Sequence, residues 1–157
     1  MDGKTYDDLR KRILDRIEFD AEIGRDMLTF ATELVVYLNN SLEKNWRAFE
    51  LGRDLNDNFS REIPQVVDRS TLPFSVAITF ANKNGETGRS YGQEHQVSVP
   101  FVIEWRNHYF EVRCSAIDEV AVTFAKYEIR EKRVLDEVSA IFDKAVAYEI
   151  EKFIASR

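Results

Sequence analysis

Two histidines and one cysteine are the side chains of this sequence best suited to metal binding or nucleophilic catalysis. His95 and His108 lie at the two ends of residues 97–106, where apolar and polar side chains largely alternate. As an extended strand, this stretch holds the two imidazoles roughly 30 Å apart, at about 3.4 Å per residue. They therefore cannot share a metal ion or a mechanism within one chain. Cys114 falls on the apolar face of another alternating stretch, where a free cysteine is usually a small core residue.

No other pattern of catalytic or metal-ligating residues occurs in the sequence. The His-Glu-x-x-His, Cys-x-x-Cys and calcium-loop patterns are absent. A Cys114–His95 dyad can be drawn across neighbouring strands, but no third group is placed to orient the histidine. The many carboxylates of the helical segments lie in no apolar setting of the kind that makes a general acid. We therefore expect no catalytic residue, no metal site, no cofactor and no enzymatic activity.

A glycine-rich loop, residues 82–96, is the strongest candidate for a ligand site. It reads NKNGETGRSYGQEHQ. Glycine-rich backbone beside cationic and hydroxyl side chains can hold a phosphate group. The loop is neither a P-loop nor a dinucleotide fingerprint, because no Gly-Lys-Ser/Thr and no helix follow it. The alternative is a hairpin tip without a ligand. The candidate contact residues are Lys83, Arg89, Ser90, Tyr91 and His95.

The element that would position this loop is a four-stranded antiparallel meander within residues 74–127. Apolar side chains alternate with polar or small ones over residues 74–80, 97–105, 110–114 and 120–124. Strands of this length and spacing are typical of an antiparallel sheet with one face on a core.

Apolar spacing also predicts the register of the strands. With residues 105–108 as the loop, the facing pairs are Ile103–Phe110, Phe101–Val112 and Val99–Cys114. The next hairpin pairs Cys114–Val120, Val112–Val122 and Phe110–Phe124. A slip of one residue would set apolar side chains against Glu111 and Arg113. Pro100 has no N–H to donate, so we expect its nitrogen to face an edge or a bulge.

Helical segments flank the predicted sheet on both sides. Apolar residues recur every three or four positions over residues 5–52 and again over residues 128–156. A single first helix would measure about 70 Å, against a radius of gyration of roughly 15 Å for a compact domain of this size. We favour a break near residues 20–24, with both pieces packed on the sheet. The alternative is an unbroken, projecting arm that mediates dimerisation. Residues 53–73 are polar and punctuated by prolines, which predicts a connector.

Composition narrows the class of protein. The chain has 157 residues, of which 44% are hydrophobic and 32% charged, so we expect one globular domain over residues 1–157. The net charge is −6 and no segment is basic, which argues against a nucleic-acid partner. One cysteine excludes an internal disulfide. Without a signal peptide or a membrane-spanning apolar run, we expect a cytoplasmic protein with no membrane partner.

These observations predict an α+β fold with a long N-terminal helical arm, a four-stranded meander and a long C-terminal helix. The helices carry more apolar surface than one small sheet can cover. The leading hypothesis is therefore a protein-interaction module of the adaptor, chaperone, immunity or inhibitor type that forms homo-oligomers, with a dimer favoured. The alternative is a protein that binds a nucleotide or another phosphate compound through residues 82–96. The predicted interface residues are Leu34, Leu38, Trp46, Phe142 and Phe153.

Overall fold

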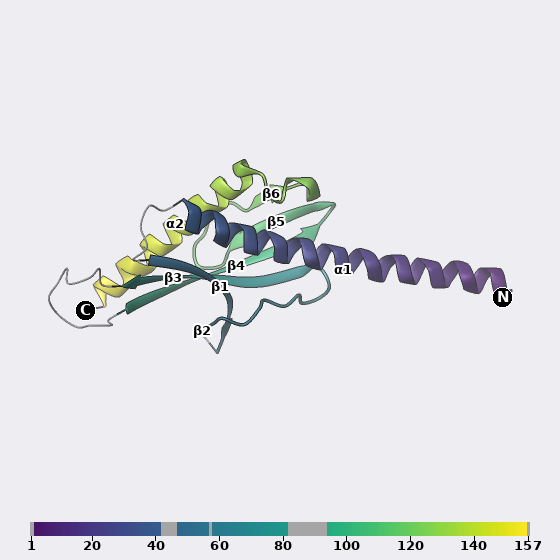
Figure 1. The fold of residues 1–157 in the computed structure, drawn as a ribbon, viewed down its shortest axis with the longest axis horizontal. Helices are drawn as coiled ribbons and strands as arrows, with labels where there is room; N and C mark the ends of the chain where they lie inside the picture. Colours follow the sequence, from purple (N-terminus) through teal and green to yellow (C-terminus); the bar gives the residue numbers. More distant parts are fainter. Residues whose placement is uncertain (1, 42–46, 57, 82–93, 157) are drawn as a thin grey trace.

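The computed structural model describes residues 2–41, 47–56, 58–81 and 94–156. Within these ranges two long helices lie on one face of a six-stranded sheet, which confirms the α+β class (Figure 1). The elements are α1 (Gly3–Asn40), β1 (Arg47–Leu55), β2 (Asn58–Ser60), β3 (Thr71–Ala81), β4 (Glu94–Arg106), β5 (Tyr109–Cys114), β6 (Val122–Phe124), the 3₁₀ helix η1 (Lys126–Glu128) and α2 (Lys132–Ala155).

The sheet is antiparallel throughout, with the strand order β2-β1-β3-β4-β5-β6. Its first two strands correct the predicted boundaries. Residues 47–52 were expected to be helical but form β1, where Phe49 lies opposite Ile78 and Leu51 opposite Val76. The predicted connector, residues 53–73, contains the end of β1, all of β2 and the start of β3. The apolar residues of this stretch are spaced as in a helix. Pairing with β3 buries these same residues against the sheet, so the strand forms instead.

The β4–β5 hairpin corrects the predicted register by two residues. Its turn consists of Asn107 and His108, both at positive φ (52° and 68°), which is the backbone of a two-residue type I′ turn. The observed partners are therefore Ile103–Val112, Phe101–Cys114 and Trp105–Phe110. A shift of two leaves every side chain on its predicted face. In the β5–β6 hairpin the predicted pairs Phe110–Phe124 and Val112–Val122 are confirmed.

Pro100 lies opposite Ser75 of β3, and its other side faces the point where β5 ends. Its carbonyl accepts a hydrogen bond from the N–H of Ser115 at 2.9 Å. The nitrogen of Pro100, which carries no hydrogen, faces the same side as this carbonyl, beyond the last residue of β5. No hydrogen bond between β4 and β5 is therefore lost.

The core lies between the inner face of the sheet and the two helices. Phe142 of α2 packs against Phe49 of β1 and Phe101 of β4, with ring centroids 5.6 Å and 6.4 Å apart. Phe30 of α1 packs against Phe124 of β6 at 5.1 Å. Each helix therefore reaches across several strands, and these contacts join both helices and the sheet into one core.

α1 is unbroken through residues 20–24, so the favoured break is wrong. It begins two residues earlier than predicted because the carboxylate of Asp2 caps it, accepting the Thr5 N–H at 2.8 Å. Gly24 does not end the helix. A Cβ at this position would lie 3.3 Å from a methyl group of Val66, so the glycine lets the segment before β3 pass close to α1.

α2 begins at Lys132, four residues later than predicted, because η1 occupies the preceding turn. The Glu128 carboxylate accepts the Ala125 N–H at 2.8 Å and also binds Arg133, also at 2.8 Å. Together these bonds hold the pKa of Glu128 below its usual range. They close the turn of η1 and set the direction in which α2 starts.

A row of polar contacts fixes α1 to η1 and the start of α2. Lys126 binds Glu22 and also lies 3.1 Å from Asp26. The hydrogen bond and charge of Lys126 lower the pKa of Glu22, and the carboxylates in turn raise the pKa of Lys126. Farther along α1, Arg130 pairs with Glu33 at 3.2 Å. These contacts set the axial position of α1, and so how much of it extends past the sheet.

β2 pairs with the outer edge of β1 only at residues 53–55, and beside Phe49 a side chain closes this edge instead. Asn39, in the last turn of α1, accepts the Phe49 N–H and donates to the Phe49 carbonyl, each at 3.1 Å. The Asn39 amide thus makes the same pair of hydrogen bonds to Phe49 that a residue of a neighbouring strand would make. It also blunts an edge that could otherwise pair with another chain.

We predict that Asn39→Ala lowers the free energy of unfolding by about 1–3 kcal/mol, because two partly buried backbone groups lose their partner. Asn40→Ala is the matched control: it makes the same change in helix propensity at the adjacent exposed residue. Urea denaturation of both variants measures the difference. Equal stabilities would show that Asn39 does not close the edge.

Candidate functional site

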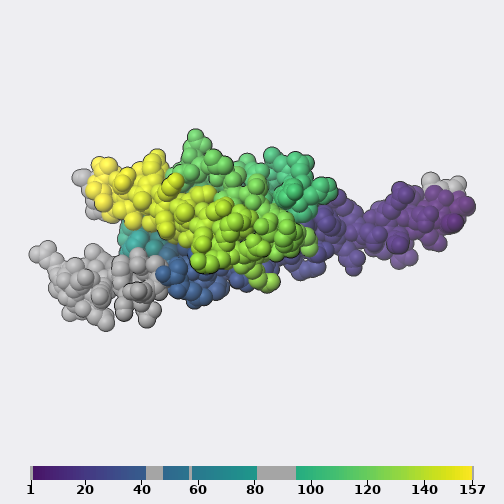
Figure 2. Space-filling view, turned by 90° about the horizontal axis from the view of Figure 1, so that it is seen from above, coloured from purple at the N-terminus to yellow at the C-terminus, as the bar shows by residue number. Residues whose placement is uncertain are grey.

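The N-terminal part of α1, residues 3–18, extends beyond the sheet, and we call it the arm. Every residue of the arm is exposed, and in Figure 2 it stands clear of the body as a purple shaft. Five large apolar side chains on it are 40% to 62% exposed. Four of them recur at intervals of three or four residues and form one stripe, with the fifth beside it. These residues are Tyr6, Leu9, Ile13, Ile17 and, beside the stripe, Leu14.

The arm leaves the body at Phe19, whose ring packs edge-on against Trp105 near the end of β4, with centroids 6.2 Å apart. Beyond this contact the sheet ends, and the helix has no further surface to cover. The buried face of α1 starts just after this contact, at Ile23 and Met27. The helix is thus already nucleated by its packed half, and the arm can propagate from it at little cost.

Charged side chains recur at every fourth residue along the arm. At 3.6 residues per turn this row winds about 160° around the helix, so it begins on the side opposite the apolar stripe and reaches the stripe only at its last residues. Arg16 is held in place by an ion pair with Asp20 at 3.1 Å, and its guanidinium carbon lies 5.8 Å from the centroid of the Phe19 ring. The row consists of Lys4, Asp8, Arg12, Arg16 and Asp20.

At the base of the arm, side chains of α1 and the turn before β3 enclose a groove of about 580 Å³. The turn brings Arg69 to the arm by placing Asp68 and Arg69 at positive φ, 50° and 64°. Three arginines and two exposed isoleucines thus meet in one groove. Among the described residues, Arg12 and Arg69 take part in no ion pair. The groove can accept an acidic segment that also carries apolar side chains. Its lining is Arg12, Ile13, Arg16, Ile17, Asp20 and Arg69.

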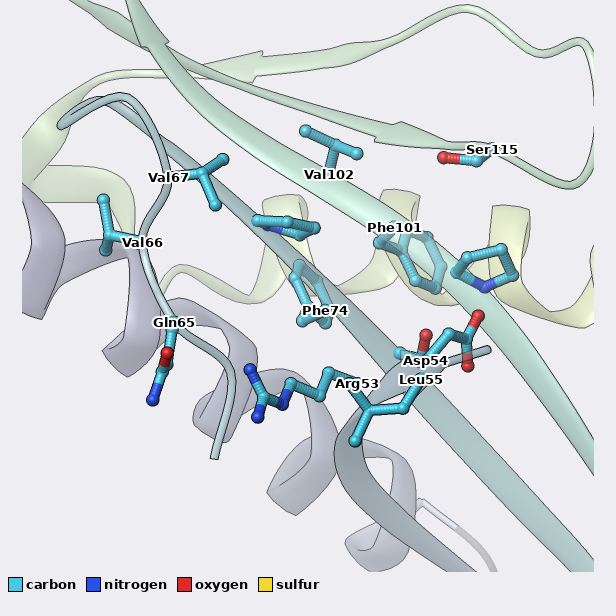
Figure 3. Close-up of a pocket in the computed structure, with 13 residues that line it drawn as sticks. Arg53, Asp54, Leu55, Gln65, Val66, Val67, Phe74, Phe101, Val102 and Ser115 are labelled. Atoms are coloured by element: carbon cyan, nitrogen blue, oxygen red, sulfur yellow. The ribbon is translucent and has the colours of Figure 1, made fainter. Parts of the chain in front are cut away.

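A second hollow, of about 320 Å³, lies on the outer face of the sheet (Figure 3). Residues 53–55 of β1 and residues 65–67 form its sides, and β3 and β4 form its floor. Val67 and Val102 supply apolar surface, and Ser115 supplies a hydroxyl. Such a mixture of apolar walls and a few polar groups is typical of sites for small molecules.

The charged groups of this hollow already have partners within the chain. Arg53 donates to Glu62, with Nε 3.1 Å from the carboxylate, and Asp54 accepts a hydrogen bond from the Ser98 hydroxyl at 3.1 Å. Ser75 differs from them. It is only 2% exposed, and its hydroxyl has no hydrogen-bond partner among the residues described. The hollow can therefore offer hydroxyl groups and apolar surface to a small uncharged molecule.

Most of the ligand-contact residues predicted in the glycine-rich loop lie outside the described residues: Lys83, Arg89, Ser90 and Tyr91. His95 is described. It lies opposite Phe80 at the start of β4, and its ring packs at a tilt against that of Phe153 of α2, with centroids 4.2 Å apart. This contact ties the end of α2 to the sheet.

The structure uses most of the predicted interface residues inside the chain. Leu34, Leu38 and Phe142 are 0%, 2% and 1% exposed and belong to the core. Their apolar surface is already covered, so they are not available to a second copy, and the prediction that they form the interface is wrong. Phe153 is 38% exposed. Trp46 lies outside the described residues.

Cys114 packs at the edge of the core, and its burial raises the pKa of the thiol. A thiol with a raised pKa is a weak nucleophile at neutral pH. Across the described ranges, no three His, Cys, Asp or Glu side chains gather so that they could hold a metal ion. No described helix is both long and apolar enough to cross a membrane.

The sequence predicted the projecting arm only as the alternative to a broken helix, and it did not predict the outer hollow. The arm had a signal: the stripe of residues 6–17 is flanked by charge at nearly every other position, whereas the buried half of α1 is richer in apolar residues. No pattern in the sequence indicates the hollow, because its sides come from residues 53–67, which the sequence predicts to be a connector. Only pairing of β1 with β2 and β3 brings them over the sheet.

The fold and its surfaces define a two-layer α+β protein with a projecting helix. Searches against models of protein families, curated proteins and solved structures find no match to this chain. The function is therefore inferred from the surfaces described above.

We predict that Cys114 reacts with a disulfide reagent at pH 7–8 several times more slowly in the folded protein than in urea. Its raised pKa keeps the folded thiol protonated, and the core covers part of it. Release of thionitrobenzoate followed by absorbance measures both rates. Equal rates would mean that Cys114 is a freely accessible thiol.

Proposed function

We propose that this chain is a non-enzymatic protein-interaction module, of the adaptor, chaperone, immunity or inhibitor type, that self-associates through its N-terminal helix as a dimer. The observation that carries the proposal is the apolar stripe of the arm, whose large side chains are 40% to 62% exposed. A contiguous apolar surface of this kind marks an interaction site in most proteins. We further propose a cytoplasmic location, where the arm would act without a membrane or nucleic-acid partner.

The expected strength of the dimer follows from the size of the stripe. Fully burying one large apolar side chain contributes about 1.5–3 kcal/mol, and these side chains are already about half covered by their own helix. Ten such side chains, five from each arm, would then contribute roughly 10 kcal/mol. Association costs an estimated 4–15 kcal/mol in lost freedom of motion. Apolar burial alone therefore supports only a weak dimer.

We predict that Ile13→Asp raises the dissociation constant of the dimer about 100-fold or more, because it places an unpaired carboxylate in the middle of each stripe. Sedimentation equilibrium measures the change. Lys11→Asp is the matched control, since it adds the same side chain on the opposite side of the arm. Far-UV circular dichroism should show both variants folded, because neither position is packed on the body. A wild-type chain that is monomeric at all concentrations would refute the proposal, as would an unchanged Ile13→Asp variant.

A second candidate function is the binding of a small ligand. The hollow on the outer face, with the unpartnered hydroxyl of buried Ser75, favours this class. The glycine-rich loop remains the proposed site for a nucleotide or another phosphate compound, with Arg89 as its cation. The two sites call for different ligands, an uncharged one at Ser75 and an anionic one at Arg89.

We predict that a ligand for either site raises the melting temperature, since binding at 100 times Kd stabilises the folded state by about 2.7 kcal/mol. A thermal-shift panel of nucleotides and small uncharged compounds tests this. Arg89→Ala should abolish the shift caused by a phosphate compound, and Ser75→Ala should reduce the shift caused by an uncharged one. A panel without any stabilising compound would count against this second function.

A further inference from the structure

We infer that the hollow on the outer face of the sheet binds a small, uncharged aromatic molecule that carries one hydroxyl group, held by a hydrogen bond to Ser75. The inference rests on the second candidate function, the binding of a small ligand, and adds the chemical class of that ligand. Three features of the described residues carry it: a recessed hydroxyl without a partner, a floor with two proline rings, and charged groups that already have partners.

The hollow lies where β3 is left incompletely paired on one side. β1 pairs with β3 only as far as Ser75 and then pairs with β2 instead. The segment before β3 pairs with it at Val67, which exchanges backbone hydrogen bonds of 2.7 Å and 3.1 Å with Thr71. Pro73 lies between these two positions, and alternate residues of a strand face the same edge, so its nitrogen faces the gap. Proline has no N–H, so the gap leaves no backbone donor without a partner.

Ser75 supplies the polar group on the floor of the hollow. It is only 2% exposed, and its hydroxyl has no hydrogen-bond partner among the residues described. Its neighbours on this face are Pro73 on the same strand and Pro100 directly across on β4. A serine between these larger side chains leaves a recess. A buried hydroxyl without a partner is costly, so a ligand that supplies the missing hydrogen bond gains affinity there.

Two proline rings and a valine make the rest of the floor apolar. Pro100 lies opposite Ser75 and Pro73 lies opposite Val102, so the four side chains form one patch on the outer face. The C–H groups beside a proline nitrogen are electron-poor, whereas the face of an aromatic ring is electron-rich. Aromatic rings therefore pack well against proline, as they do in the grooves that bind proline-rich peptides. The floor favours an aromatic ring over a saturated ring of the same size.

The walls limit the size of the ligand and add apolar contact. Figure 3 shows Leu55 on one side of the hollow and Val66 and Val67 on the other. These three side chains are 38%, 39% and 45% exposed, so a ligand between them buries apolar surface that now faces water. A volume of about 320 Å³ is at the small end for ligand sites. It suits a single ring with a short substituent.

The charged groups of the walls favour a neutral ligand. The guanidinium of Arg53 is paired with Glu62, and the carboxylate of Asp54 accepts a hydrogen bond from Ser98. An anionic ligand would lie close to the Asp54 carboxylate, and a cationic one would lie close to Arg53. Either would lose hydration without gaining a free partner of opposite charge.

The test titrates the full chain with four ring compounds of similar size: benzyl alcohol, cyclohexylmethanol, toluene and benzoate. Amide chemical shifts of ¹⁵N-labelled protein give both the dissociation constant and the location, the latter from the amides of Ser75, Val102 and Ser115. We expect benzyl alcohol to bind at these amides with a Kd of roughly 1 mM, which is typical of so small a molecule. Cyclohexylmethanol should bind about threefold more weakly because it lacks the aromatic face. Benzoate should bind at least tenfold more weakly because of its charge.

A variant of Ser75 tests the hydrogen bond. Ser75→Ala should weaken benzyl alcohol about three- to tenfold and leave toluene unchanged, because toluene has no hydroxyl to lose a partner. The variant should fold like the wild type, since the hydroxyl that it removes has no partner in the chain. Thr79→Val is the matched control. It removes a hydroxyl from the same face of β3 outside the hollow, where Thr79 accepts a hydrogen bond from Gln96 at 3.3 Å. All four compounds should bind this control as they bind the wild type.

The proposed class of ligand is wrong if benzyl alcohol shifts no amide of the hollow, or if cyclohexylmethanol or benzoate binds as tightly as benzyl alcohol. It is also wrong if Ser75→Ala weakens toluene and benzyl alcohol equally. An uncharged compound of another kind that stabilises the protein through Ser75 in the thermal-shift panel would keep the second function and still overturn the aromatic class.

Discussion

The length of α1 relative to the sheet it covers is the constraint on which the rest of the structure depends. Its C-terminal half buries Ile23 to Leu38 over the inner face, and the ion pairs to Lys126 and Arg130 fix how far along its axis it sits. Since the sheet ends at Trp105, the remaining turns must leave the body. The packed half supplies the nucleation that these turns would lack alone. The arm is therefore a consequence of how the core is built.

The two faces of the sheet differ in polarity and in what covers them. The inner face is apolar and is closed by α1 and α2, with aromatic contacts such as Phe49–Phe142 that join strand to helix. The outer face carries small and polar residues, and the hollow on it is bounded by the end of β1 and by residues 65–67. Asn39 closes the free edge of β1, which keeps the sheet from acting as a template for another chain.

The groove at the base of the arm adds specificity to an apolar surface that has little of its own. A stripe of leucine, isoleucine and tyrosine accepts many apolar partners, and its burial only just exceeds the cost of association. The arginine side chains of the groove at Arg69 lie beside this stripe and favour an acidic group there. A partner would have to match both features.

The sequence by itself determined the faces of the strands, because alternation places each side chain on one side of an extended chain wherever its partner lies. It therefore predicted Phe110–Phe124 correctly and kept Phe101 on the inner face even where the register shifted by two. Only the tertiary structure decided that residues 47–52 are a strand, that α1 continues through Gly24, and that Leu34 is buried while Ile13 is exposed. Those outcomes depend on which distant segments pair with or cover one another. The local spacing of apolar residues is the same whether they face a sheet, a second chain or water.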